Sequence, residues 1–235
     1  MGSKLRWTAG LAAVAFLAHG TPARAAAADP FELTFGGSFL VGQPLGDFAD
    51  QVGSPYGLGG HMALARPGHA FGLRLEATGL VYGSETRRIP VGQAGLRQSV
   101  EVETTNGMAT LGLGPQFVAP KGSIRPYVTA FAGFSSFSTD STVRADGDFV
   151  PVAQSTNYDD TVFAYGGGAG ILIPLGAGKS GGLALDLGAR FVAGGQVRYL
   201  AEGDISDRPG GGVSFIPRQT DSNRFEFHIG VTMIP

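Results

Sequence analysis

The chain has 235 residues, no cysteine, 39 glycines and a formal net charge of −2. The lack of cysteine excludes a disulfide framework and a cysteine metal site, and the acidic balance argues against nucleic acid as a partner, because that requires a basic patch. Glycine is used at more than twice its average of about 7%. The glycines lie among alternating apolar residues, which indicates a β protein with many turns.

The first 25 residues have the pattern of an export signal. Lys4 and Arg6 supply positive charge, residues 9–18 form a small and apolar run, and residues 23–25 read Ala-Arg-Ala, a cleavage pattern. Ten such residues are too few for a spanning helix, which needs about 20; a retained anchor is the alternative. Removal of residues 1–25 would leave residues 26–235 as one domain and lower the net charge from −2 to −5.

Beyond residue 30, apolar and polar residues alternate with a period of two. Leu33 and Phe35, for example, alternate with Glu32 and Thr34, as in a strand with one apolar face. The same pattern recurs along the chain and predicts eight strands, at roughly 31–41, 56–65, 71–82, 100–117, 127–137, 161–173, 183–193 and 223–234.

In two of these segments the sequence does not determine which face of the strand is the apolar one. Residues 127–137 are apolar or small throughout, so either face could be the apolar one. Val100 and Val102 lie on the opposite parity to the apolar residues that follow them. Either a bulge intervenes near residues 104–107, or this part of the strand projects beyond the membrane.

The connections between the strands alternate in length. Residues 66–70, 118–126 and 174–182 form short turns, and four longer polar connections are expected at residues 42–55, 83–99, 138–160 and 194–222. Short periplasmic turns and long outer loops are typical of outer-membrane barrels, and strands of about 9–11 residues suffice to cross a bilayer. The alternative is a soluble exported sandwich or a lipocalin-like barrel.

Aromatic residues gather near the ends of the predicted apolar faces, as they do at membrane interfaces. We expect a periplasmic girdle of Phe31, Phe71, Phe117 and Tyr127, and an outer girdle of Phe39, Tyr56, Phe163, Tyr165, Phe191 and Phe225.

Three segments carry a resemblance to a known family. They are residues 42–48 after the first strand, 125–130 opening the fifth, and 185–191 in the seventh. With them the chain resembles the small outer-membrane β-barrel proteins of the OmpA/OmpX type. Such barrels usually end on an aromatic residue, whereas this chain ends Met-Ile-Pro. The resemblance implies an eight-stranded antiparallel up-and-down transmembrane β-barrel in a Gram-negative outer membrane, with outer-membrane lipid and the assembly machinery as partners.

An eight-stranded barrel is just wide enough for side chains to fill it, so this porin-like architecture does not suit general diffusion. The residues predicted to point inward include Glu32, Arg74, Glu76, Asp186, Arg190, Glu226 and His228. We predict an interior ion-pair network of Arg74, Glu76, Asp186, Arg190 and Glu226; a proton or ion path is the alternative. Arg190 and Glu226 should lie at similar height on neighbouring strands, and Glu76 is the alternative partner.

The sequence offers little for catalysis or metal binding. Lipid-modifying enzymes on this scaffold need a serine and a histidine within reach, but His61 and His228 have no serine at a recognisable spacing, and His69 lies in a tight turn. Asp146 and Asp148 belong to an acidic loop without an EF-hand ligand series. We therefore expect no catalytic site, no metal and no cofactor.

The expected function is that of a non-enzymatic, monomeric integral outer-membrane protein with an envelope-structural or surface-interaction role. A narrow pore for ions or small solutes is the alternative, and a soluble carrier of an apolar ligand is a third reading. The sequence does not identify a surface partner.

Overall fold

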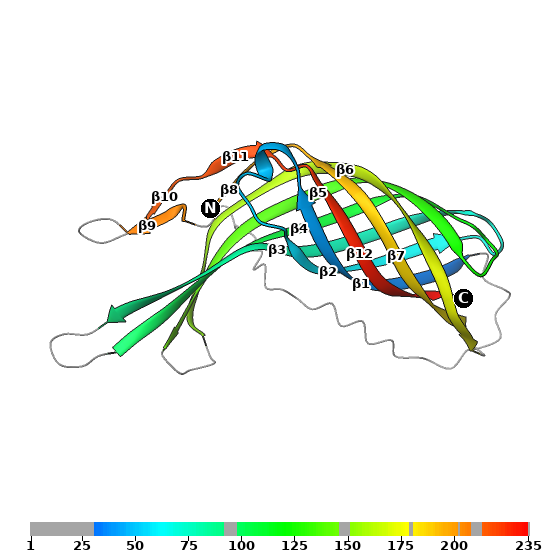
Figure 1. Cartoon of the computed structure of the whole chain (residues 1–235), viewed down its shortest axis with the longest axis horizontal. Coiled ribbons are helices and arrows are strands. Elements are labelled where there is room, and N and C mark those ends of the chain that lie inside the picture. Colours follow the sequence, from blue (N-terminus) through cyan, green and yellow to red (C-terminus); the bar gives the residue numbers. More distant parts are fainter. Residues whose placement is uncertain are drawn as a thin grey trace, which may run out of the picture.

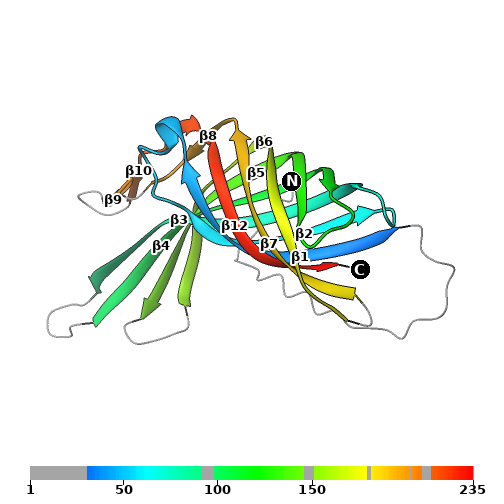
Figure 2. The same ribbon diagram turned by 45° about the vertical axis from the view of Figure 1, so that its right-hand side comes forward.

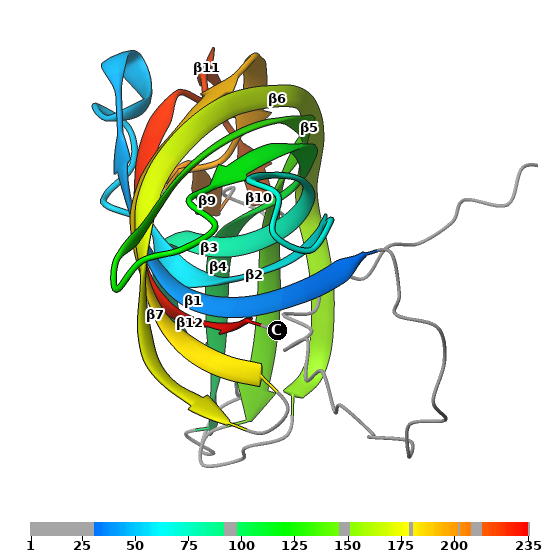
Figure 3. The same ribbon diagram turned by 90° about the vertical axis from the view of Figure 1, so that its right-hand side faces the viewer.

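The computed structural model describes residues 31–91, 98–145, 151–178, 181–201, 203–207 and 213–234. The predicted export signal at residues 1–25 lies outside them. Eight strands form one closed antiparallel barrel, seen from the side in Figure 1 and end-on in Figure 3. In barrel order they are β1 (Glu32–Pro44), β2 (Tyr56–Ala65), β3 (Phe71–Val91), β4 (Gln98–Val118), β5 (Arg125–Ala145), β6 (Pro151–Gly178), β7 (Gly181–Gly194) and β12 (Arg224–Ile234). The predicted eight-stranded antiparallel barrel is confirmed.

Each strand pairs with its neighbours in the sequence, and β12 closes the sheet by pairing with β1. The closing register aligns Phe35 with Met233 and Val41 with Phe227. Because successive side chains of a strand point to opposite faces, these pairs lie on the outer surface, and the residues between them point inward. Closure leaves no free edge along the barrel wall.

Three strands, β3, β5 and β6, are much longer than the sequence pattern indicated, whereas β4 has nearly its predicted bounds. The β3–β4 ladder continues to Val91 and Gln98, and the β5–β6 ladder reaches Arg144 and Pro151. The loops expected at residues 83–99 and 138–160 are therefore largely strand, and β6 likewise takes up much of the turn expected at residues 174–182. Threonine and valine are frequent in the added parts, and both favour strands. Figure 2 shows the two hairpins projecting beyond the barrel.

The parity of Val100 and Val102 is explained by projection of the strand and not by a bulge near residues 104–107. The ladder between β3 and β4 shifts register between Val81 and Gly83, so Tyr82 is the extra residue. On β4, Asn106 and Met108 are both buried, so that strand keeps its parity. The bulge is thus on the partner strand, and Val100 and Val102 lie in the projecting part of the sheet.

Smaller elements cover the same end of the barrel. A 3-10 helix, η1 (Gly46–Phe48), follows β1. The connection between β7 and β12 holds two short ribbons, one of β8 (Gln196–Tyr199) with β11 (Arg218–Asp221), the other of β9 (Ile205–Asp207) with β10 (Val213–Phe215). In the part of the chain that the structure describes, no helix is both long and apolar enough to cross a membrane.

Candidate functional site: the barrel interior

The outer surface of the barrel is apolar along every strand. Leu33, Leu58, Leu73, Leu113 and Ile229 are among many large apolar side chains that are exposed there. A contiguous apolar surface of this extent is not found on ordinary soluble monomers. It matches the outward apolar band of a barrel embedded in hydrocarbon.

Nine of the ten predicted girdle residues lie on this outer surface. Several of them pack in pairs across the ladder, such as Phe71 with Phe117 and Phe191 with Phe225, with ring centroids 5.0 and 5.4 Å apart. The prediction for Tyr127 is wrong, because its side chain is only 4% exposed and points into the barrel. The strand 127–137 therefore faces inward with Tyr127, Phe131 and Phe137.

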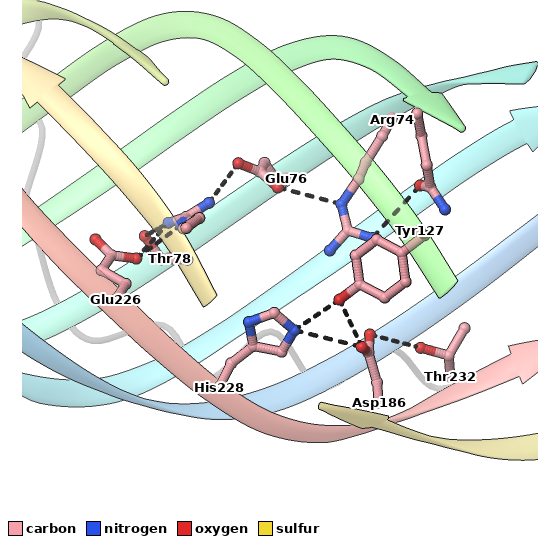
Figure 4. Close-up of polar contacts among 10 residues, drawn as sticks. Arg74, Glu76, Thr78, Tyr127, Asp186, Glu226, His228 and Thr232 are labelled. Carbon is pink, nitrogen blue, oxygen red and sulfur yellow. Dashed lines mark hydrogen bonds and ion pairs between the residues drawn. The ribbon is translucent and has the colours of Figure 1, made fainter. Parts of the chain in front are cut away.

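Arg190 lies at the centre of the interior, on β7. It is directly opposite Glu226 of β12 in the ladder, and its Nε and Nη2 donate to Glu226 Oε2 at 2.9 and 2.6 Å. Its Nη1 forms an ion pair with Glu76, which reaches across the barrel from β3, and Nη2 also donates to Thr78 at 3.1 Å. Both carboxylates considered as partners of Arg190 thus contact it at once (Figure 4).

The chain of ion pairs continues toward the end with the long connections, which we call the extracellular end because barrels of this kind have long outer loops and short periplasmic turns. Arg224 Nε donates to Glu226 Oε1 at 2.7 Å, and both side chains are fully buried. Arg224 Nη2 then donates to Thr110 at 2.8 Å, and Thr110 shares a hydrogen bond with Ser135. Arg224 was not among the predicted site residues, although its parity matches that of Glu226.

The same chain continues toward the periplasmic end. Arg74 Nε donates to Glu76 at 3.1 Å, and its Nη1 donates to Gln116 at 3.4 Å. The Arg74 guanidinium also lies 6.0 Å from the centre of the Tyr127 ring. Arg74, Glu76, Arg190, Glu226 and Arg224 form the ion-pair layer, which crosses the interior from β3 to β7 and β12.

Asp186 belongs to a separate cluster below this layer. Its carboxylate accepts hydrogen bonds from the hydroxyls of Tyr127 at 2.7 Å and Thr232 at 3.1 Å. His228 Nε2 lies 2.9 Å from the Tyr127 hydroxyl and 3.3 Å from Asp186. The hydrogen bonds of His228 thus go to a carboxylate and a phenol, not to a serine (Figure 4).

The buried charges on the described barrel strands balance, whereas buried Asp204 lies in the connection after β7 and pairs with Arg218 there. The ion-pair layer holds three arginines and two glutamates, and Asp186 supplies the third negative charge. A buried charge is tolerated when it is paired and hydrogen-bonded. This balance and the contacts described above suit a fixed structural network, whereas an ion path would need charges free to exchange partners.

Above the ion-pair layer, the extracellular end is filled by apolar side chains. Phe48, Tyr82, Phe137 and Tyr199 pack with ring centroids 5.4–6.4 Å apart, and Leu40, Leu80 and Met108 surround them. Phe48 and Tyr199 come from η1 and β8, so the long connections supply part of this aromatic plug. Burial raises the pKa of Tyr199 above its ordinary value, as expected for a phenol in apolar surroundings.

Among the described residues, two cavities inside the barrel adjoin the charged side chains. A void of about 30 Å³ lies beside the ion-pair layer, between residues such as His61, Glu76 and Arg190. A larger cavity of about 250 Å³ occupies the periplasmic end and is bordered by the turn residues Gly68 and Pro120. We call this larger cavity the vestibule.

Comparison with known proteins finds distant likenesses only. No protein-family model matches the chain, and no curated protein is similar in sequence. Among solved structures, Neisserial surface protein A is 12% identical, with a TM-score of 0.46 over 87% of this chain and 99% of that one. A major outer membrane protein from Thermus thermophilus is 12% identical, with a TM-score of 0.45 over 86% and 99%. Ail of Yersinia pestis is 11% identical, with a TM-score of 0.38 over 86% and 96%.

The assignment of the chain as a membrane-spanning barrel rests on its own surface and interior. Backbone polar groups in a bilayer must be satisfied internally, which a closed barrel achieves. This sheet is closed, its outer face is apolar and its inner face carries paired charges. The chain therefore has the architecture of a membrane-spanning outer-membrane β-barrel.

Proposed function

We propose that the protein is a non-enzymatic, closed outer-membrane barrel whose role is structural or one of surface contact. The observation that carries this proposal is the double obstruction of its interior. The aromatic plug fills the extracellular end, and the ion-pair layer fills the middle. Within the part of the chain that the structure describes, a solute would therefore meet two obstructions in series.

The projecting hairpins support a role at the cell surface. They extend the sheet beyond the barrel on the side of the long connections, which is the outer side in barrels of this kind. Their described parts carry many hydroxyl side chains, with contacts such as Thr104 to Ser141 at 2.9 Å and Thr156 to Asp140 at 2.7 Å. A polar, hydrogen-bonded sheet suits exposure to water.

A narrow pore is the second candidate, because polar groups line much of the interior. The vestibule would be its periplasmic entrance, and the small void beside Arg190 would be its constriction. Planar-bilayer conductance distinguishes this candidate from the closed barrel. A soluble carrier does not suit the exposed apolar belt.

Fractionation and surface proteolysis test the proposal. The protein should fractionate with outer membranes and migrate differently on gels before and after boiling, because a folded barrel resists detergent. Protease added to intact cells should cut within residues 138–160 or 194–222 and spare residues 66–70. Cleavage only after the outer membrane has been opened would reverse the orientation and contradict a surface role.

A further inference from the structure

The vestibule has no role in a purely structural barrel. It is lined by Arg74 and Tyr127 at its inner end and bordered by Gly68, His69 and Pro120 at its mouth. Arg74 and Tyr127 also line the small void above, so the vestibule ends at the ion-pair layer. One water needs about 10–15 Å³ of such volume, so about 250 Å³ can hold a small organic solute.

Two guanidinium groups that line the vestibule have unused donors. Arg74 uses one N–H of Nε for Glu76 and one of Nη1 for Gln116, and Arg125 uses Nε for the carbonyl of Ala119 at 2.8 Å. Within the described residues, Nη2 of Arg74 and both terminal nitrogens of Arg125 make no hydrogen bond. Each guanidinium has five donors. Among the described residues, only Gln51 and Ser222 have a buried side-chain polar atom without a partner, so the unused donors of Arg74 and Arg125 are not enclosed by protein and face the open space of the vestibule.

The charge of the lining selects the kind of occupant. Arg74 and Arg125 are opposed in the lining by one carboxylate, Glu32. Asp186 lies behind the wall, where Tyr127 and Thr232 satisfy its oxygens. Arg74 is already paired with Glu76, whereas no carboxylate among the described residues forms an ion pair with Arg125. The planar guanidinium fork of Arg125 matches a phosphate or carboxylate group.

The apolar part of the lining adds a second property. Val118, Leu172 and Ile234 face the vestibule beside the two arginines. An anion with a small apolar or carbon-bearing portion would therefore be better accommodated than a bare ion.

We propose that the vestibule binds a small phosphate- or carboxylate-bearing solute from the periplasm, with the anionic group held by Arg74 and Arg125. The site takes up its ligand and releases it through the same mouth, because the ion-pair layer closes its inner end. It is a binding site and not a transport path.

Arginine side-chain NMR tests this proposal on the full-length barrel in a phosphate-free maltoside detergent. Inorganic phosphate and acetate serve as the two probes. At least one should shift the Nε–H signals of Arg74 and Arg125 saturably, with a dissociation constant on the order of 1–10 mM. Arg125→Gln should raise the dissociation constant at least about fivefold. This change corresponds to the loss of one anion contact of roughly 1 kcal/mol.

Arg66→Gln is the matched control. Arg66 is an exposed residue at the same end, but its guanidinium lies 5.9 Å from the centre of the Phe31 ring on the outside of the barrel. Its loss should leave the titration unchanged. Equal weakening by both variants would indicate non-specific attraction and overturn the site. Linear shifts with both salts, or shifts with a short-chain phospholipid alone, would overturn it too.

Discussion

The two ends of the barrel interior are built differently. At the extracellular end, inward residues such as Leu40, Met108 and Phe137 are apolar, and Phe48 and Tyr199 cover them from the long connections. At the periplasmic end, the turns are short and the interior opens into the polar vestibule. The same wall of strands thus encloses an apolar region and a more polar one.

The length of the connections accounts for this difference. An apolar side chain inside a barrel is stabilised only where other groups exclude water from it. The connections after β1 and β7 are long enough to fold back over the mouth, whereas the turns between β2 and β3 are not. On β3 and β7 the inner face therefore changes from apolar residues such as Leu80 and Val192 to charged ones such as Glu76 and Arg190.

The largest effect should come from breaking the layer between the two regions. Arg190→Ala would leave Glu76 and Glu226 buried beside each other without their shared cation. Loss of one partner from a buried pair typically costs about 3–5 kcal/mol. Urea unfolding from lipid vesicles should show a loss of that order, with Glu226→Ala similarly destabilising.

The double variant sharpens this prediction. If Arg190 and Glu226 act as a pair, the combined loss should be smaller than the sum of the two single losses. Strictly additive losses would mean that the contact contributes no coupling, and the ion-pair layer would then not be a structural unit.

A charged substitution on the outer face should destabilise the barrel almost as much as a substitution in the ion-pair layer. Leu75→Arg places a charge in hydrocarbon and should cost about 2–4 kcal/mol near the bilayer middle. Thr86→Arg is the control on the same strand, because Thr86 is exposed in the projecting part of β3. We expect a change within about 0.5 kcal/mol there. Similar losses at the two positions in the same folding titration would contradict the proposed membrane boundary.

The aromatic plug should respond more weakly and more locally. Phe48→Ala removes a fully buried ring, and such truncations cost about 3–5 kcal/mol in rigid cores. Because η1 lies in a connection that can relax, we expect about 1–3 kcal/mol and faster proteolysis within residues 45–55. Unchanged proteolysis would show that Phe48 does not hold this connection in place.

The smallest effect is expected in the projecting hairpins. Glu85 accepts a hydrogen bond from Arg87 at 2.7 Å, which lowers the pKa of Glu85. Because the pKa is lowered, ionised Glu85 stabilises the fold at pH values above the ordinary pKa of glutamate. This contribution is lost as the pH falls through the lowered pKa of the folded state. Both side chains are more than a third exposed, so Glu85→Gln should cost at most about 0.5 kcal/mol at neutral pH. A loss above about 1 kcal/mol would show that this pair is shielded from solvent.

The strand wall could be predicted from the sequence, because alternation of apolar and polar residues directly reports which side faces lipid. The same parity placed Arg190 and Glu226 inside and at one height. Arg224 carried the same parity and could have been included. Tyr127 was misplaced because residues 127–137 lack polar alternation, so an aromatic residue at a strand end looked like part of the girdle.

The parts formed by the connections could not be predicted in this way. Phe48 and Tyr199 lie in segments without periodicity, and their burial depends on how those segments fold over the mouth. The continuation of β3, β5 and β6 beyond the barrel was also not predicted, because a strand with water on both faces needs no apolar alternation. Long-range packing, not local pattern, determines both features.

Planar-bilayer recording tests most directly whether the interior is closed. The wild-type protein should give no discrete conductance steps, and Phe48→Ala should remain silent because the ion-pair layer still fills the middle of the barrel. Reproducible steps from the wild-type protein would contradict the closed interior and favour the narrow pore.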